Sequence, residues 1–182
     1  MKIVSFNYRG LAKPDKKLTL RRLLAADPLD IIFLQETLGP TNAISHTLGT
    51  MLPGWAFTCL DAHGRSGGIA MGYNSRSIKL FNCWGGSRNI RVDIHSTDLD
   101  MDFVIFNIYG SCHHRPYFWY KLLGSDILQM DNIILGGDLN FSIRQSESWG
   151  HRAQRDPLSE YFETTLESHH LIDILFAKIQ AT

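Results

Sequence analysis

Short apolar runs that alternate with segments of helical periodicity restrict the folds open to this sequence more than any other feature. The clearest run, Ile31 to Leu34, leads into Gln35 and Glu36, as expected for a buried strand that holds a polar group at its tip. The pattern predicts further strands at residues 4–6, 55–60, 68–73, 77–81, 91–95, 102–109, 132–135 and 171–176. Helices are predicted at residues 16–26, 42–52, 116–130 and 157–168. This order of elements predicts one layered α/β domain.

Local signals refine two of the predicted helices. Asn42 is a candidate N-cap for the second helix, and Pro116 suits the first turn of the third. In that third helix Trp119, Ile127 and Met130 belong to one apolar stripe, so we expect Trp119 in the core.

Composition excludes several classes of protein. With 44% hydrophobic and 20% charged residues, the 182-residue chain can build a packed core. Lys plus Arg equals Asp plus Glu at 18 each, so the net charge gives no argument for nucleic acid, and any such claim must rest on local residues. No apolar run approaches the ~18 residues of a membrane span, so no membrane partner is expected. The N-terminal segment is expected to form the first strand, with no secretory signal.

The three cysteines, Cys59, Cys83 and Cys112, are odd in number and contain no Cys-x-x-Cys pair. This disfavours both a disulfide framework and a thiolate zinc site. We expect each cysteine to be a small buried hydrophobe.

Polar side chains recur where the predicted strands end: Asn7, Glu36, Tyr109, Asp138 and Asn140. A strand end can hold such groups on a rigid rim that solvent reaches. A carboxylate for a hard metal ion, a candidate base, a phenol donor and two amides suit hydrolysis of a phosphate ester, which needs positioning and charge neutralisation. From the residues alone, other readings stay open. Glu36 could be a surface carboxylate, Asp138 and Asn140 a turn, and Tyr109 a core residue.

Five segments resemble, in order and spacing, motifs of the endonuclease/exonuclease/phosphatase family. The strand before Asn7-Tyr-Arg-Gly resembles the opening motif, and Gln35-Glu36 resembles the second. The segment from Gly64 to Gly68, Gly-Arg-Ser-Gly-Gly, is similar to a glycine-rich segment of LINE-type retrotransposon endonucleases. Phe-Asn-Ile-Tyr109 and Gly-Gly-Asp138-Leu-Asn resemble the motifs that carry the active-site tyrosine and the Gly-Asp-x-Asn signature.

The resemblance implies a DNase I-like fold, in which two mixed β-sheets pack face to face between helices. It implies a Mg²⁺-dependent endonuclease that nicks DNA, with Mn²⁺ as an alternative cation, and most like the plant-type LINE retrotransposon branch. A reverse transcriptase would accompany it in the full-length ancestor. The resemblance also implies an intracellular, nuclear location, for which the residues themselves give no signal.

The resemblance further assigns roles to the five polar residues. Glu36 would bind Mg²⁺, which prefers one or two carboxylates together with phosphate oxygens and water. Asp138 would orient and deprotonate the attacking water or donate to the leaving oxygen, and Asn140 would hold the phosphate. Asn7 would support Asp138 or the metal ion, and Tyr109 would donate its hydroxyl to the phosphate oxyanion.

The resemblance stops before the family's final Ser-Asp-His motif. Residues 174–182 contain neither histidine nor carboxylate. We therefore expect residues 1–182 to be a partial domain that lacks the last strands, with apolar residues exposed at Ile172, Ile174, Leu175 and Phe176, and to be inactive as a nuclease on its own. Two alternatives stay open: a non-catalytic retroelement remnant or interaction protein, and a phosphatase of the same fold that acts on lipid or inositol phosphates.

Basic and aromatic residues supply candidates for substrate contact, since such side chains bind phosphates and stack on bases. The candidates are Arg115, Arg144, Trp149 and Arg152. The adjacent pairs His113-His114 and His169-His170 are expected at loops or helix ends, because neighbouring residues do not converge on one ion.

Overall fold

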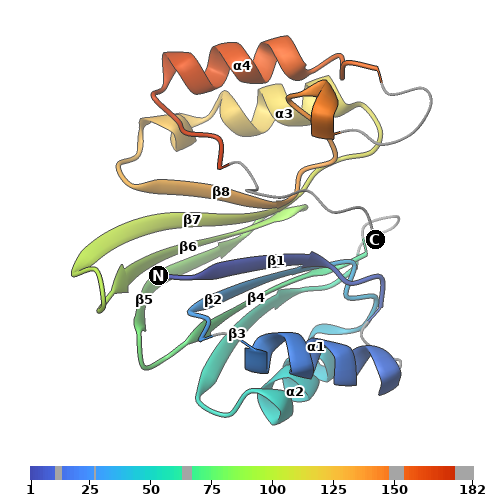
Figure 1. The fold of residues 1–182 in the computed structure, drawn as a ribbon, viewed down its shortest axis with the longest axis vertical. Coiled ribbons are helices and arrows are strands. Elements are labelled where there is room, and N and C mark those ends of the chain that lie inside the picture. The colour runs from blue at the N-terminus through green and yellow to red at the C-terminus, as the bar shows by residue number, and fades with distance from the viewer. Residues whose placement is uncertain (11–13, 27, 63–66, 148–153, 175–182) are drawn as a thin grey trace.

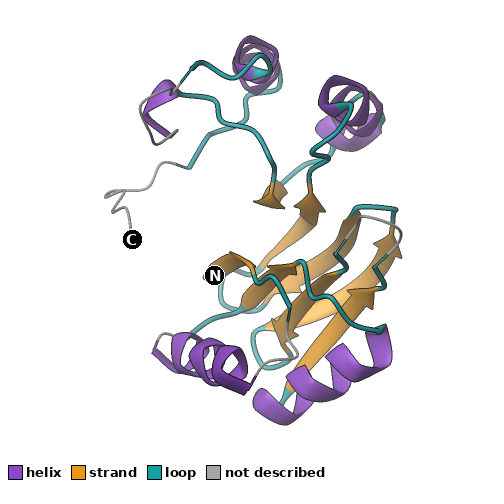
Figure 2. Cartoon of the chain, turned by 90° about the vertical axis from the view of Figure 1, so that its right-hand side faces the viewer, coloured by secondary structure: helices purple, strands orange, loops and turns teal. Residues whose placement is uncertain are grey.

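The computed structural model describes residues 1–10, 14–26, 28–62, 67–147 and 154–174. Two four-stranded sheets pack face to face, and helices cover their outer faces, giving four layers (Figure 1). Figure 2, turned by a quarter, shows the helices on the two outer sides of the paired sheets. This arrangement confirms the predicted α/β sandwich. Within the described ranges, no helix is both long and apolar enough to cross a membrane.

The first sheet has the strand order β1-β2-β4-β3. Its strands are β1 (Ile3–Asn7), β2 (Ile31–Gln35), β3 (Trp55–Leu60) and β4 (Ile69–Asn74). The β1–β2 pair is parallel and the other two pairs are antiparallel. Helices α1 (Pro14–Ala26) and α2 (Thr41–Met51) cover its outer face (Figure 1).

The second sheet has the order β5-β6-β7-β8. Its strands are β5 (Ile78–Gly85), β6 (Asn89–Ser96), β7 (Met101–Tyr109) and β8 (Ile133–Asp138), and only the β7–β8 pair is parallel. Helices α3 (Arg115–Leu123) and α4 (Ser159–Ser168) lie over it (Figure 1). Two 3-10 helices, η1 (Asp126–Gln129) and η2 (Gln145–Glu147), follow α3 and β8 in the chain.

The two parallel pairs decide where the site lies. In the first, Asn7 is paired with Gln35, and in the second, Tyr109 is paired with Asp138. Strand β1 also contacts β8 from the other sheet. Because parallel strands end at the same edge of a sheet, the carboxyl ends of all four strands meet at one end of the sandwich.

Three apolar clusters hold the layers together. The cluster between the sheets includes Ile31, Phe33, Met71, Ile90 and Ile105, all nearly inaccessible to solvent. The second joins the first sheet to α1 and α2, and the third joins the second sheet to α3 and α4. Alternate residues of β6 are buried, so one face of this strand packs against the first sheet.

Two predicted helix features were wrong. Asn42 is not the N-cap, because α2 begins at Thr41 and the cap position is Pro40. Distant Asp61 instead accepts hydrogen bonds from the backbone N–H and the hydroxyl of Thr41, at 2.5 and 2.6 Å. The helix predicted to reach Met130 ends at Leu123, and Ile127 lies in the separate helix η1. Gly124 follows α3, and its low helix propensity explains the break.

The expectations for the cysteines and for the chain after α4 also needed correction. Cys83 and Cys112 are exposed, and only Cys59 is half-buried. The predicted strand at residues 171–176 does not form over residues 171–174, where Ile172 and Ile174 are exposed as expected. Leu175 and Phe176 lie outside the described residues.

We predict that Trp119→Ala destabilises the fold by about 3–5 kcal/mol, because it empties the centre of the third cluster. Trp119 is 1% exposed and meets Phe118, Phe141 and Phe162 edge to face. Urea unfolding measures the loss. Tyr117→Ala on the same helix is the control, since Tyr117 is 68% exposed and its loss should change stability by less than about 0.5 kcal/mol. Equal losses in both variants would contradict this assignment of the core.

Candidate active site

Four of the five predicted polar residues meet at the carboxyl ends of β1, β2, β7 and β8. The Asn7 side-chain nitrogen donates to Glu36 Oε1 at 2.9 Å and to Asp138 Oδ2 at 2.5 Å. The Tyr109 hydroxyl donates to the same Glu36 oxygen at 3.0 Å. One amide therefore links a carboxylate on the first sheet to a carboxylate on the second.

Glu36 has a backbone conformation that few side chains adopt. Its φ is +54°, in the left-handed region, where a residue other than glycine is strained by about 1–3 kcal/mol. The neighbouring backbone holds it there. The Gly10 N–H donates to the Glu36 carbonyl at 2.7 Å, and the Leu38 N–H donates to the Gly67 carbonyl at 2.7 Å. This bend turns the Glu36 carboxylate out of β2 toward Asn7 and Tyr109.

Two glycines allow the close approaches on which the site depends. A Cβ on Gly67 would lie 2.8 Å from the Glu36 Cα, so the chain before β4 packs directly on the strained residue. Gly137 has a φ of +129°, and a Cβ there would lie 2.0 Å from the Ile108 carbonyl oxygen. Only glycine fits at such contacts. Gly137 thereby lets β8 bring Asp138 beside Tyr109.

The Tyr109 hydroxyl is held in its protonated form. Burial raises its pKa first, and the hydrogen bond to Glu36 and the negative charges around it add to the effect, so that the pKa reaches about 12. Tyr109 is only 6% exposed. In this structure the hydroxyl donates its proton to Glu36. Donation to a phosphate oxygen, which the family resemblance implies, stays a prediction for this residue. The arrangement supports a positioning role for the phenol toward the carboxylate.

Asn140 does not join the other four residues. Its side-chain nitrogen donates to the Gly110 carbonyl at 2.7 Å, and its φ is +55°. The amide therefore ties the loop after β8 to the end of β7. The expected contact with a phosphate stays a prediction for this residue.

The residues predicted to contact substrate are either in ion pairs or outside the described residues. Arg115 pairs with Asp156 and Arg144 with Asp173, so each positive charge has a carboxylate partner that is not one of the four site residues. Burial alone would raise the pKa of Asp156, but the Leu158 N–H and Arg115 outweigh it and lower the pKa overall. Trp149, Arg152 and the segment Gly64-Arg65-Ser66 lie outside the described residues.

Sequence reasoning missed one cation beside the site. The Arg88 guanidinium lies 5.5 Å from the centre of the Tyr109 ring, and the Arg88 carbonyl accepts the Tyr109 N–H at 2.8 Å. Arg88 makes no ion pair with any residue in the part of the chain that the structure describes. Arg88 lies in the turn between β5 and β6, where no sequence motif identifies it as a site residue.

The donor set fits a small hard cation. Glu36 Oε2 and Asp138 Oδ1 accept no hydrogen bond from a described residue, and the Asn7 amide oxygen is a further candidate ligand. Mg²⁺ takes few protein ligands and keeps water and phosphate oxygens for the rest, so the Glu36 carboxylate with the Asn7 amide oxygen suffices for weak binding. No cluster of three or more His, Cys, Asp and Glu side chains suited to a metal ion occurs in the described ranges.

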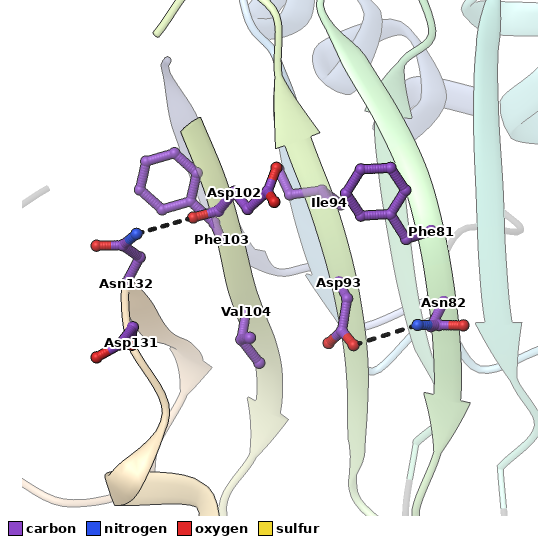
Figure 3. Close-up of a pocket in the computed structure, with 9 residues that line it drawn as sticks. All are labelled: Phe81, Asn82, Asp93, Ile94, Asp102, Phe103, Val104, Asp131 and Asn132. Carbon is purple, nitrogen blue, oxygen red and sulfur yellow. Dashed lines mark hydrogen bonds between the residues drawn. The ribbon is translucent and has the colours of Figure 1, made fainter. Parts of the chain in front are cut away.

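A second acidic location lies elsewhere on the molecule. A pocket of about 240 Å³ on the second sheet is lined by Asp93, Asp102 and Asp131 among others (Figure 3). It sits near the start of β7, seven residues before Tyr109, which in a strand corresponds to roughly 20 Å. Asp93 pairs with Arg91 and Asp102 with His95. Its acidic lining would repel a phosphate, so we do not assign substrate to it.

The sequence matches one family model, and the fold is similar to several solved structures. A sequence model described as the Endonuclease/Exonuclease/phosphatase family matches residues 4–170. Similar solved structures include a humanized form of TDP2 from D. rerio (TM-score 0.60, 17% identity). Others are the endonuclease domain of TRAS1, a telomere-specific non-LTR retrotransposon (0.62, 15%), and a mannosyl-6-phosphatase from Bacteroides thetaiotaomicron (0.59, 16%). Among curated proteins, none matches the sequence.

The alignments cover most of this chain but less of the others. They include 77%, 91% and 79% of this chain for TDP2, TRAS1 and the phosphatase. The chain spans 62%, 71% and 67% of those three chains, respectively. At these identities the likeness shows the fold alone.

We predict that one tyrosine of the folded protein, Tyr109, titrates at about pH 12. Because this pKa lies above the ordinary value of 10.0, the stability from protonated Tyr109 is complete below about pH 10 and is lost as the pH rises through about 12. Phenolate absorbance after a rapid pH jump measures the titration, and Tyr109→Phe assigns it. Glu36→Gln should lower this pKa. A Tyr109 that titrates near 10 in the wild type would contradict the observed contact with Glu36.

We also predict that Mg²⁺ binds weakly and largely through Glu36. Glu36→Gln should weaken binding by about tenfold or more, because it removes a full charge next to the cation. Isothermal titration calorimetry measures the affinity. Asp131→Asn, which removes an exposed carboxylate from the distant pocket, is the matched control and should leave binding unchanged. Tight binding that survives Glu36→Gln would exclude this site.

Proposed function

The chain belongs to the endonuclease/exonuclease/phosphatase family, and from this premise we propose that it contributes the catalytic half-site of a Mg²⁺-dependent endonuclease that nicks DNA. The proposal rests on one observation above all, the junction of Glu36 and Asp138 through Asn7. Two carboxylates held at one amide, with unengaged oxygens, offer one group for a cation and one for water. Hydrolysis of a phosphodiester needs both.

The side chains divide the chemistry as follows. Glu36 would hold the cation, with the Asn7 amide oxygen as a further ligand, and a bound Mg²⁺ supplies charge neutralisation at the phosphate oxygens. Asp138 would orient the attacking water and accept its proton, with the Asn7 hydrogen bond fixing the carboxylate in place. Tyr109 stays protonated and holds Glu36. Arg88, over the Tyr109 ring, would attract the negative substrate.

Two observations favour DNA and the retrotransposon branch over other substrates. The sequences Gly64-Arg-Ser-Gly-Gly68 and Gly-Gly-Asp138-Leu-Asn agree with the LINE-type form, and the endonuclease domain of TRAS1 is among the similar structures. A chain from this branch would work beside a reverse transcriptase and in the nucleus. The chain spans about two thirds of the similar structures, so the activity proposed is that of the whole polypeptide to which these residues belong.

We predict that the whole polypeptide nicks supercoiled plasmid with Mg²⁺, whereas residues 1–182 alone give little or no nicking. Asp138→Asn in the whole polypeptide should reduce the rate about 10²–10⁴-fold because the general base is lost. Glu36→Gln should raise the Mg²⁺ concentration needed for half-maximal rate. Agarose-gel conversion of supercoiled to open-circular plasmid gives the rates. Asp131→Asn, with the same change of charge far from the site, should nick like the wild type.

Two results would count against this function. Release of inorganic phosphate from sugar or inositol phosphates, without nicking, would favour the phosphatase alternative. The absence of both nicking and phosphate release in the wild type, with Mg²⁺ and with Mn²⁺, would favour a non-catalytic remnant or interaction protein.

A further inference from the structure

We propose that the buried amides of Gln35 and Asn107 are positioning residues, which lock the two sheets in register so that Glu36 and Tyr109 meet. This inference rests on the proposed function for its catalytic consequence, but its structural part can be tested without activity.

The two amides form a direct polar link between the sheets. Both side chains are 0% exposed. Gln35 Nε2 donates to Asn107 Oδ1 at 2.6 Å, and Asn107 Nδ2 donates to the Ala70 carbonyl at 2.9 Å. Gln35 also contacts the Ser5 hydroxyl at 3.3 Å. The network therefore joins β1, β2 and β4 of the first sheet to β7 of the second.

The network lies directly beneath the site. Side chains alternate along a strand, so Asn107 and Tyr109 point to the same face of β7, as Ser5 and Asn7 do on β1. Two residues of strand span about 7 Å, which puts the amides one layer below the site residues. Gln35 immediately precedes Glu36. Each strand thus carries a polar anchor just before the residue that it contributes to the site.

The stability of the fold alone does not explain why the amides of Gln35 and Asn107 are buried between the sheets. The surrounding cluster between the sheets is apolar, and aliphatic side chains of similar volume would fill the same space without the penalty of burying polar atoms. Aliphatic contacts are not directional, however, and tolerate small sliding of one sheet on the other. A hydrogen bond has a fixed length and direction and does not tolerate such sliding. The two amides therefore select one register between the sheets.

The test uses Gln35→Met, Asn107→Leu and the double variant, with Asn82→Leu on the exposed outer face as control. Each single variant leaves a buried amide without its partner and should be destabilised in urea unfolding. The double variant removes both amides and should recover stability toward the wild type. We nevertheless expect its crystal structure to show the Tyr109 hydroxyl beyond hydrogen-bond distance of Glu36 Oε1, which it contacts in the wild type.

Enzyme kinetics provide the second measurement. If the proposed function holds, the double variant should lose about 10²-fold in kcat with little change in KM, as expected when groups are slightly misplaced. A wild type without nuclease activity, together with the expected loss of the Tyr109–Glu36 contact in the double variant, would remove the proposed function and leave the positioning role intact.

Two outcomes overturn the positioning role. A double variant with recovered stability, whose crystal structure keeps the Tyr109 hydroxyl within hydrogen-bond distance of Glu36, would show that the amides only fill space. A double variant as unstable as the singles would show that the fold itself requires them. In contrast, a Tyr109–Glu36 contact that is lost in the double variant and kept in Asn82→Leu would support the inference.

Discussion

The hydrogen bonds of a single side-chain nitrogen, on Asn7, connect the two halves of the candidate site. Glu36 comes from the first sheet and Asp138 from the second, and both carboxylates accept from this amide. Among the described contacts, no other side chain donates hydrogen bonds to both carboxylates, so this amide offsets the repulsion between them. The rest of the site follows from this junction: the bend at Glu36, the close approach at Gly137 and the phenol of Tyr109 all bring groups toward it.

The site also shows where this fold departs from the arrangement that stability alone would select. Glu36 adopts a strained left-handed backbone, Gln35 and Asn107 bury amides in an apolar core, and Tyr109 loses contact with water. Each departure lies at or just below the same strand ends. The apolar clusters on both outer faces supply the compensating stability. The conflict between local preference and structure therefore marks the functional end of the sandwich.

Much of this organisation could be predicted because it depends on periodicity along the chain. Apolar runs located the strands, and the polar residue after each run identified Asn7, Glu36, Tyr109 and Asp138, which the structure brings together. What could not be predicted depends on partners distant in sequence. Asp61, rather than Asn42, accepts the hydrogen bond at the start of α2. Asp156 forms an ion pair with Arg115. Arg88 contacts the Tyr109 ring from a turn that carries no recognisable motif. The break after Leu123 reflects Gly124 prevailing over a continuous apolar stripe.

The central claim, a cation site at the Asn7 junction, is tested most directly by paramagnetic broadening of side-chain amide signals in solution. Mn²⁺ broadens nuclear resonances close to it, and the chain carries reporter amides at both acidic locations. Asn7 lies at the junction, and Asn132 lines the distant pocket (Figure 3). Substoichiometric Mn²⁺ should broaden the Asn7 side-chain signal first and leave that of Asn132 sharp. Preferential broadening of Asn132, or equal broadening of both, would contradict the account.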